Sequence, residues 1–170
     1  MTEDPRRTRH RSYRIADNFL AFWLGVVAPH LAEIERGLGE GIVDVILDGL
    51  DDFLGPRFED AFRAHLRRLG ETGALGPEIV AVGPFWTVGS EPVEIDAVVL
   101  AGGRREVTWV GEARWARRVD AGPIIAALRR KAAVLSRARP GLRVAVAARE
   151  AVSGPVDLAV TAADIFAPDG

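Results

Sequence analysis

The most informative stretches of the sequence are Val93–Asp96, which reads Val-Glu-Ile-Asp, and Gly111–Trp115, which reads Gly-Glu-Ala-Arg-Trp. Each places a carboxylate, Asp96 in the first and Glu112 in the second, inside an apolar run that is typical of a β-strand. Burial of a carboxylate is costly unless the group is paired or binds a metal ion. Two such residues on consecutive predicted strands therefore point to a divalent-metal site.

The composition is that of a soluble globular protein. The 170 residues are 48% hydrophobic and 27% charged, which is enough for one domain with a sizeable core and a smaller appendage. The formal net charge of -2 gives no overall attraction to nucleic acid or acidic membranes. The chain has no cysteine, which excludes disulfides, thiolate zinc sites and cysteine nucleophiles. No secretory signal is visible, so we expect a cytoplasmic protein without a membrane segment.

Residues 1–55 are predicted to form an N-terminal helical segment. Residues 1–11 are polar and rich in arginine, and we expect them to be poorly ordered. Asp17 can cap a helix that is disturbed at Pro29. A loop at Gly37–Gly41 then leads to a second helix, whose apolar stripe consists of Ile42, Ile46, Leu50 and Phe53.

Residues 56–170 are predicted to form one α/β domain. Gly55-Pro56 opens a helix that runs to about Leu69, after which the periodicity becomes strand-like. Turn residues separate three strands of an antiparallel meander at Glu78–Val88, Val93–Leu100 and Glu106–Trp115. A helix from Asp120 ends before Pro140 and is followed by strands at Leu142–Ala148 and Val156–Val160. Helices set against a mixed sheet give a two- or three-layer α/β fold.

The alternation of side chains along a strand places the candidate site. Glu94 and Asp96 share one face of the second predicted strand, and Glu112 and Arg114 share one face of the third. Because neighbouring strands lie about 4.8 Å apart, Asp96 and Glu112 can approach one ion together. Magnesium favours one or two carboxylates plus water and phosphate oxygens. Such an ion can activate water beside a phosphodiester, and Arg114 would lie where negative charge builds.

The order helix, three strands, helix, strand, with Asp96 on the second strand and Glu112-Ala113-Arg114 on the third, resembles the PD-(D/E)xK nuclease superfamily. The resemblance implies a restriction-endonuclease-like core (αβββαβ) with a mixed sheet, and Mg²⁺ or Mn²⁺ as cofactor. It implies that Glu59, Asp96 and Glu112 hold the metal. It also implies that Asp96, Glu112 and Arg114 are the catalytic residues.

A closer resemblance is to a C-terminal domain of unknown function on archaeal-type AAA+ ATPases. Tyr13–Trp23 is similar to the tyrosine–isoleucine–aspartate–phenylalanine–tryptophan stretch of those proteins. Three further motifs follow in the same order, at Gly83–Trp86, Glu94–Asp96 and Gly111–Trp115. The chain has no phosphate-binding loop of its own. The resemblance therefore implies an ATPase partner or a missing ATPase domain.

The basic residues leave alternatives open. Arg114 stands where the superfamily carries a lysine, and a guanidinium offers positive charge but is larger and does not deprotonate. The chain has 22 lysine and arginine residues, and Lys131 is the only lysine. Some superfamily members relocate the catalytic lysine to the helix that follows the third strand, but for Lys131 we favour a solvated side chain. The basic clusters that include Arg63, Arg117 and Lys131 could also contact a DNA backbone.

Three functions are consistent with these patterns. The first is a magnesium-dependent endodeoxyribonuclease, a hydrolase that acts on DNA phosphodiesters. The second is a catalytically degenerate module that binds nucleic acid or a partner protein. The third is a regulatory or dimerisation module of an ATPase, with the helix Phe19–Trp23 as the interface of a homodimer. If no metal binds, Glu59, Asp96 and Glu112 are expected to form ion pairs with the arginines.

Overall fold

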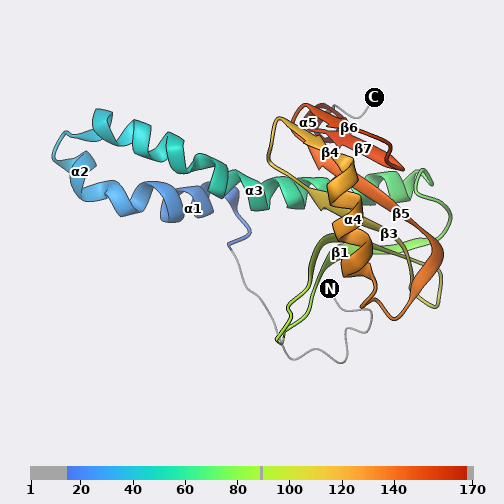
Figure 1. Cartoon of the computed structure of the whole chain (residues 1–170). Helices are drawn as coiled ribbons and strands as arrows, with labels where there is room; N and C mark the ends of the chain where they lie inside the picture. The colour runs from blue at the N-terminus through green and yellow to red at the C-terminus, as the bar shows by residue number, and fades with distance from the viewer. Residues whose placement is uncertain (1–14, 89, 168–170) are drawn as a thin grey trace. The chain divides into compact units, whose positions relative to one another are not determined.

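The computed structural model describes residues 15–88 and 90–167 (Figure 1). The described residues form two compact units, a helical unit of residues 15–57 and an α/β unit that begins at Phe58. The predicted division into residues 1–55 and 56–170 stays a prediction. Residues 1–11, which were expected to be poorly ordered, lie outside the described residues. The start of the ATPase-like stretch at Tyr13 lies outside them as well.

The helical unit consists of short helical segments and the first part of a long helix. These are α1 (Asn18–Phe22), η1 (Trp23–Val27), η2 (Ala28–His30), α2 (Leu31–Glu35) and the start of α3 (Gly39–Glu71). Asp17 caps α1 as predicted, because its side chain accepts a hydrogen bond from the Leu20 amide at 2.7 Å. The rings of Phe22 and Phe53 meet edge to face with their centroids 5.5 Å apart.

Helix α3 runs without a break from Gly39 to Glu71, so the predicted helix boundary at Gly55-Pro56 is wrong. Proline in a helix interior removes one hydrogen bond and costs about 3 kcal/mol. Residues on both sides of Pro56 make side-chain contacts. The Arg57 guanidinium lies 3.8 Å from the centroid of the Phe53 ring. Further along, helical spacing buries Phe58, Phe62 and Leu66.

The α/β unit is built on a five-stranded mixed sheet in the order β1-β2-β3-β5-β7. Its strands are β1 (Ile79–Trp86), β2 (Glu94–Ala101), β3 (Glu106–Ala113), β5 (Ala138–Ala148) and β7 (Leu158–Thr161). Strands β1, β2 and β3 pair antiparallel, which confirms the predicted meander. Strand β5 pairs parallel with β3 and with β7. Helix α4 (Ala121–Ala132) makes the crossover from β3 to β5.

Helices cover both faces of this sheet and make a three-layer unit. On one face, the buried end of α3 packs on Ala97, Val99 and Trp109. On the other face, Leu128 and Ala132 of α4 pack on residues that include Val110 and Val146. Figure 1 shows α4 lying across the strands. The apolar runs of β2 and β3 are buried on both faces, so a charged residue within them needs a partner.

Three short elements were not predicted. Strands β4 (Arg118–Asp120) and β6 (Ala151–Ser153) pair parallel in a separate two-stranded sheet, and α5 (Ala162–Phe166) follows β7. Thr161 and Asp164 form a capping box at the start of α5. Within residues 15–88 and 90–167, no helix has the length and apolarity needed to cross a bilayer.

Candidate functional site

The candidate site lies where β2 begins and β3 ends. The antiparallel register pairs Ala97 with Gly111, so Asp96 and Glu112 occupy the next positions on neighbouring strands. The Ala113 amide donates a hydrogen bond to Asp96 Oδ2 at 2.9 Å. The Asp96 carboxylate thus takes the place of a backbone acceptor and is held against β3.

Asp96 has a strongly perturbed acidity. Burial is the main cause that raises the pKa of Asp96 to about 6, and the charges of Glu112 and Glu59 act in the same direction. The hydrogen bond from Ala113 and the charge of Lys131 oppose this increase. Asp96 is therefore close enough to Glu59, Glu112 and Lys131 to interact with each of them electrostatically.

Glu112 is a buried carboxylate with two basic partners. The residue is 5% exposed. Its Oε2 lies 3.1 Å from the Nζ of Lys131, and its Oε1 accepts a hydrogen bond from Nη2 of Arg114. The preference for a solvated Lys131 is therefore wrong. Helix α4 buries Leu128 and Ala132 on the sheet face that carries Glu112, and this brings Lys131 to the carboxylate.

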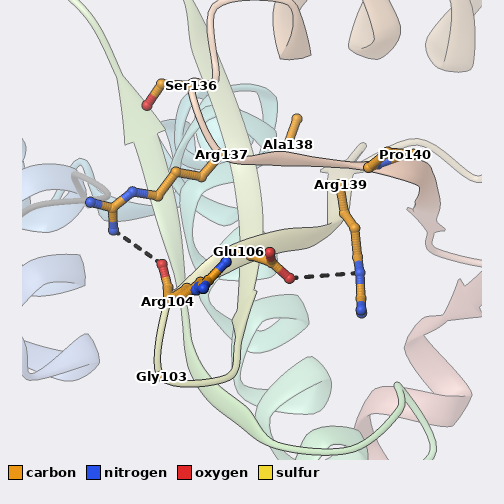
Figure 2. A pocket seen from close by; sticks show the side chains of 8 residues that line it. All are labelled: Gly103, Arg104, Glu106, Ser136, Arg137, Ala138, Arg139 and Pro140. Atoms are coloured by element: carbon orange, nitrogen blue, oxygen red, sulfur yellow. Dashed lines mark hydrogen bonds and ion pairs between the residues drawn. The ribbon is translucent and has the colours of Figure 1, made fainter.

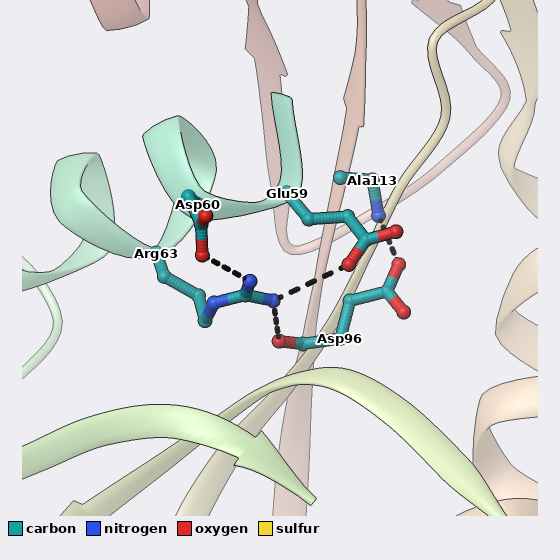
Figure 3. A network of polar contacts seen from close by, with 5 residues as sticks. All are labelled: Glu59, Asp60, Arg63, Asp96 and Ala113. Atoms are coloured by element: carbon teal, nitrogen blue, oxygen red, sulfur yellow. Dashed lines mark hydrogen bonds and ion pairs between the residues drawn. The ribbon is translucent and has the colours of Figure 1, made fainter. Parts of the chain in front are cut away.

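Arg63 organises the α3 side of the site (Figure 3). Its Nη1 donates to the backbone oxygen of Asp96 at 2.7 Å and lies 3.6 Å from Oε2 of Glu59, while its Nη2 lies 2.5 Å from Oδ1 of Asp60. The residue is 5% exposed. The predicted contact of Arg63 with DNA is corrected accordingly, because its guanidinium ties α3 to the start of β2 instead.

Glu59 completes the acidic side of the cluster. Figure 3 shows its carboxylate near that of Asp96. Burial is the largest cause that raises the pKa of Glu59; Arg63 lowers it, whereas Glu94 and Asp60 raise it. Glu94 is exposed at the first position of β2. The site therefore holds several carboxylates whose charges disfavour one another.

Arg117 lies apart from these contacts. Its Nε donates to Oε1 of Glu150 at 2.7 Å, and both side chains are exposed. The hydrogen bond raises the pKa of Arg117 and lowers that of Glu150. The predicted contact of Arg117 with DNA stays a prediction.

The described conformation does not present a formed metal site. Within residues 15–88 and 90–167, no three histidine, aspartate or glutamate side chains are placed so that they could hold one ion. Both oxygens of Glu112 have basic partners, and one oxygen of Asp96 accepts a backbone hydrogen bond. The carboxylates expected to bind metal are thus neighbours, but they are stabilised here by protein groups.

The sequence carried signals for the residues that the prediction misjudged. Arg63 follows Asp60 by three positions and Glu59 by four, and these are the spacings at which helical side chains meet. The ion pairs of Arg63 with Glu59 and Asp60 could therefore have been predicted from helical spacing alone. The pairing of Lys131 with Glu112 depends on how α4 lies on the sheet. The only signal for it was that Lys131 is the single lysine in the chain.

The fold and the site together define an α/β domain with a cluster of carboxylates and basic side chains at one end of a mixed sheet. Residues 23–124 match the family described as "Archaea bacterial proteins of unknown function" (DUF234), and the chain belongs to this family. It is 29% identical over 115 residues to an uncharacterized protein of Methanocaldococcus jannaschii. The match covers 68% of this chain but 25% of that protein, so the chain spans about a quarter of its relative's length. No solved structure matches the chain.

Proposed function

We propose that the α/β unit is a PD-(D/E)xK-type nuclease domain with a restriction-endonuclease-like core, which hydrolyses DNA phosphodiesters with the help of Mg²⁺ or Mn²⁺. One observation carries the proposal: Asp96 of β2 interacts electrostatically with Glu59 of α3 and with Glu112 of β3, and the only lysine of the chain contacts Glu112. Four elements supply these groups. A network of this kind in a buried position is a candidate functional site rather than a source of stability.

The chemistry of the donors fits a hard divalent cation. Glu59, Asp96 and Glu112 offer carboxylate oxygens, which Mg²⁺ and Mn²⁺ prefer. Their mutual repulsion contributes to the raised pKa of Asp96, and a bound cation would relieve it. We expect Glu112 to exchange a contact with Lys131 or Arg114 for the ion. When bound, the ion would stabilise charge on the phosphate and activate a water molecule.

The basic side chains then have separate roles. Release from Glu112 leaves the Lys131 ammonium free to donate hydrogen bonds to a phosphate oxygen, where negative charge increases during hydrolysis. The Arg114 side chain is 57% exposed, so it can contact the phosphate from the solvent side. Arg63 holds the backbone of Asp96 and acts as a positioning residue.

The test combines metal binding with cleavage. Calorimetric titration with MnCl₂ is expected to give binding to the parent chain and none to the Glu112→Gln or Asp96→Asn variants. Supercoiled plasmid DNA should be nicked by the parent in the presence of Mn²⁺ or Mg²⁺ and not by these variants. Asp157→Asn is the matched control, because Asp157 also accepts a backbone hydrogen bond, from Val144 at 2.8 Å, outside the site. Cleavage by Asp96→Asn equal to the parent would falsify the proposal.

A second candidate is a module that binds DNA, or regulates or dimerises an ATPase, without cleaving anything. The observation that favours it is the engagement of both Glu112 oxygens by basic side chains. This candidate predicts DNA binding that weakens steeply with salt, no Mn²⁺ binding and no nicking. The same two measurements therefore separate it from the nuclease proposal.

A further inference from the structure

A basic pocket of about 600 Å³ lies at the other end of the sheet from the carboxylate cluster. It is lined by Gly103, Arg104, Glu106, Ser136, Arg137, Ala138, Arg139 and Pro140 (Figure 2). These residues come from the turn between β2 and β3, the start of β3, the segment before β5 and the start of β5. Since β3 runs from Glu106 to Ala113, its length separates the pocket from the candidate site by on the order of 20 Å.

The charges of this pocket are unbalanced. Three arginines line it, and Glu106 is the one carboxylate among its lining residues. The Nε of Arg139 lies 3.6 Å from Oε2 of Glu106, which is too long for a good hydrogen bond. Among the described residues, no carboxylate pairs with Arg104. Nη1 of Arg137 donates to the backbone oxygen of Arg104 at 3.2 Å, which joins the two sides of the pocket.

Arg105, the neighbour of Arg104 in this turn, is not among the residues that line the pocket. Arg105 adopts a left-handed backbone conformation with φ of 53°, which is uncommon for a residue with a side chain. Its buried Nε has no hydrogen-bond acceptor among the described residues. A buried donor without an acceptor is costly, but the charge that faces the pocket is that of its lining arginines, which include Arg104 and Arg139.

We propose that this pocket binds a phosphate group through Arg104 and Arg139. Guanidinium groups match phosphate oxygens with paired hydrogen bonds, and Glu106 is the group that the phosphate displaces from Arg139. The phosphate can belong to a nucleic-acid backbone or to a small phosphate monoester. The inference does not depend on the proposed nuclease activity, because no residue of the carboxylate cluster lines the pocket.

Arginine-directed modification of the full chain tests the proposal residue by residue. Phenylglyoxal labelling is followed by peptide mass mapping, with inorganic phosphate, adenosine monophosphate or a short DNA duplex as protectant. At least one protectant is expected to slow the labelling of Arg104 and Arg139 relative to Arg36, an exposed arginine of the helical unit. Protection by the duplex alone identifies a nucleic-acid backbone, and protection by all three identifies a general phosphate site. No selective protection by any of them overturns the proposal.

Variants then measure the affinity for the protectant that is effective. Arg104→Gln and Arg139→Gln are each expected to weaken binding about tenfold, while the matched control Arg36→Gln leaves it unchanged. Glu106→Gln is expected to tighten binding, because it removes the carboxylate that competes for Arg139. Tighter binding is not expected from a variant that only damages the fold. Equal affinities for Arg104→Gln, Glu106→Gln and Arg36→Gln would contradict the proposal.

Discussion

Lys131 Nζ lies 3.1 Å from Glu112 Oε2, so the only lysine of the chain pairs with the most buried carboxylate among the described residues. The two residues come from α4 and β3, and the contact depends on the crossover that lays α4 across the sheet. The Lys131–Glu112 ion pair should therefore affect both the stability of the α/β unit and the proposed catalytic site.

Replacement of Lys131 by methionine is expected to destabilise the protein by about 1–3 kcal/mol, because Glu112 keeps a buried charge with one exposed partner, Arg114. Methionine preserves most of the apolar stem. Urea unfolding followed by circular dichroism measures the change. The double variant Lys131→Met with Glu112→Gln should regain most of the loss. A Lys131→Met protein as stable as the parent would show that Glu112 does not need Lys131 as a partner while Arg114 is present.

Lys131 should contribute more to the rate of DNA cleavage than Arg114 does. If the nuclease proposal holds, Lys131→Met is expected to lower kcat by about 100-fold or more, because a charge that stabilises the transition state is lost. Arg114→Gln is expected to have a smaller effect, since its side chain is 57% exposed and screened by solvent. Plasmid nicking rates at saturating Mn²⁺ compare the two variants. An opposite ranking would assign the main role to Arg114.

Asp96 should make stability depend on pH. Its pKa is about 6 in the folded protein against an ordinary value of 3.8, so between these values the folded state holds more protons than the unfolded chain. Stability therefore falls as the pH rises through this window, and the loss is complete above about pH 6. Allowing for partial exposure, the loss is about 2 kcal/mol.

The Asp96→Asn variant should accordingly be more stable than the parent near neutral pH. Asparagine cannot ionise, but its side-chain oxygen can still accept the Ala113 hydrogen bond. The gain should disappear at about pH 4, where Asp96 of the parent is largely protonated. Thermal unfolding across this range measures it, with Asp157→Asn as the control that shows no such gain. A pH-independent difference would rule out ionisation of Asp96 as the cause.

Gly111 should be intolerant of a side chain. A Cβ at this position would lie 2.9 Å from two ring atoms of Phe62 and 3.3 Å from the Ala145 oxygen. Gly111→Ala is therefore expected to destabilise the protein by about 1–3 kcal/mol. At Gly49, inside α3, a Cβ meets nothing within 4 Å, so Gly49→Ala is expected to stabilise it by up to about 1 kcal/mol. Chemical denaturation of both variants tests the contrast.

The homodimer prediction concerns the helical unit, where Phe19 is 73% exposed and Trp23 is 40% exposed. If this segment is the interface, Trp23→Ala should weaken self-association at least about tenfold, because aromatic residues dominate interface energies. Sedimentation equilibrium compares it with Val134→Ala, which changes an exposed apolar residue of the α/β unit. A parent chain that is monomeric at all concentrations would contradict the prediction.

The sequence predicted the meander, the crossover helix and the mixed sheet because each depends on local periodicity and turn residues. It did not predict β4 and β6, since three residues are too few for any periodicity to be recognised. The prediction also placed a helix boundary at Gly55-Pro56. It did so because the low intrinsic helix propensity of proline was given more weight than tertiary contacts.

For the candidate site, neighbouring positions on β2 and β3 were predictable from alternation and register. The partners of these carboxylates were not. Arg63 points inward because Asp96 offers a backbone oxygen at the start of β2. Lys131 reaches Glu112 because α4 packs on that face. Both contacts join residues distant in sequence, and a pattern in one segment does not encode them.

Helix α3 belongs to both compact units, and this has a practical consequence for dissecting the protein. A fragment that starts at Phe58 would begin its first helix one residue before Glu59, where amide groups lack helical acceptors and the end frays. Glu59 and Asp60 would then sit in a loosened turn, and Arg63 would lose its fixed counterions. Studies of the α/β unit by itself therefore have to retain several turns of the preceding helix, or inactivity of the fragment will be mistaken for inactivity of the protein.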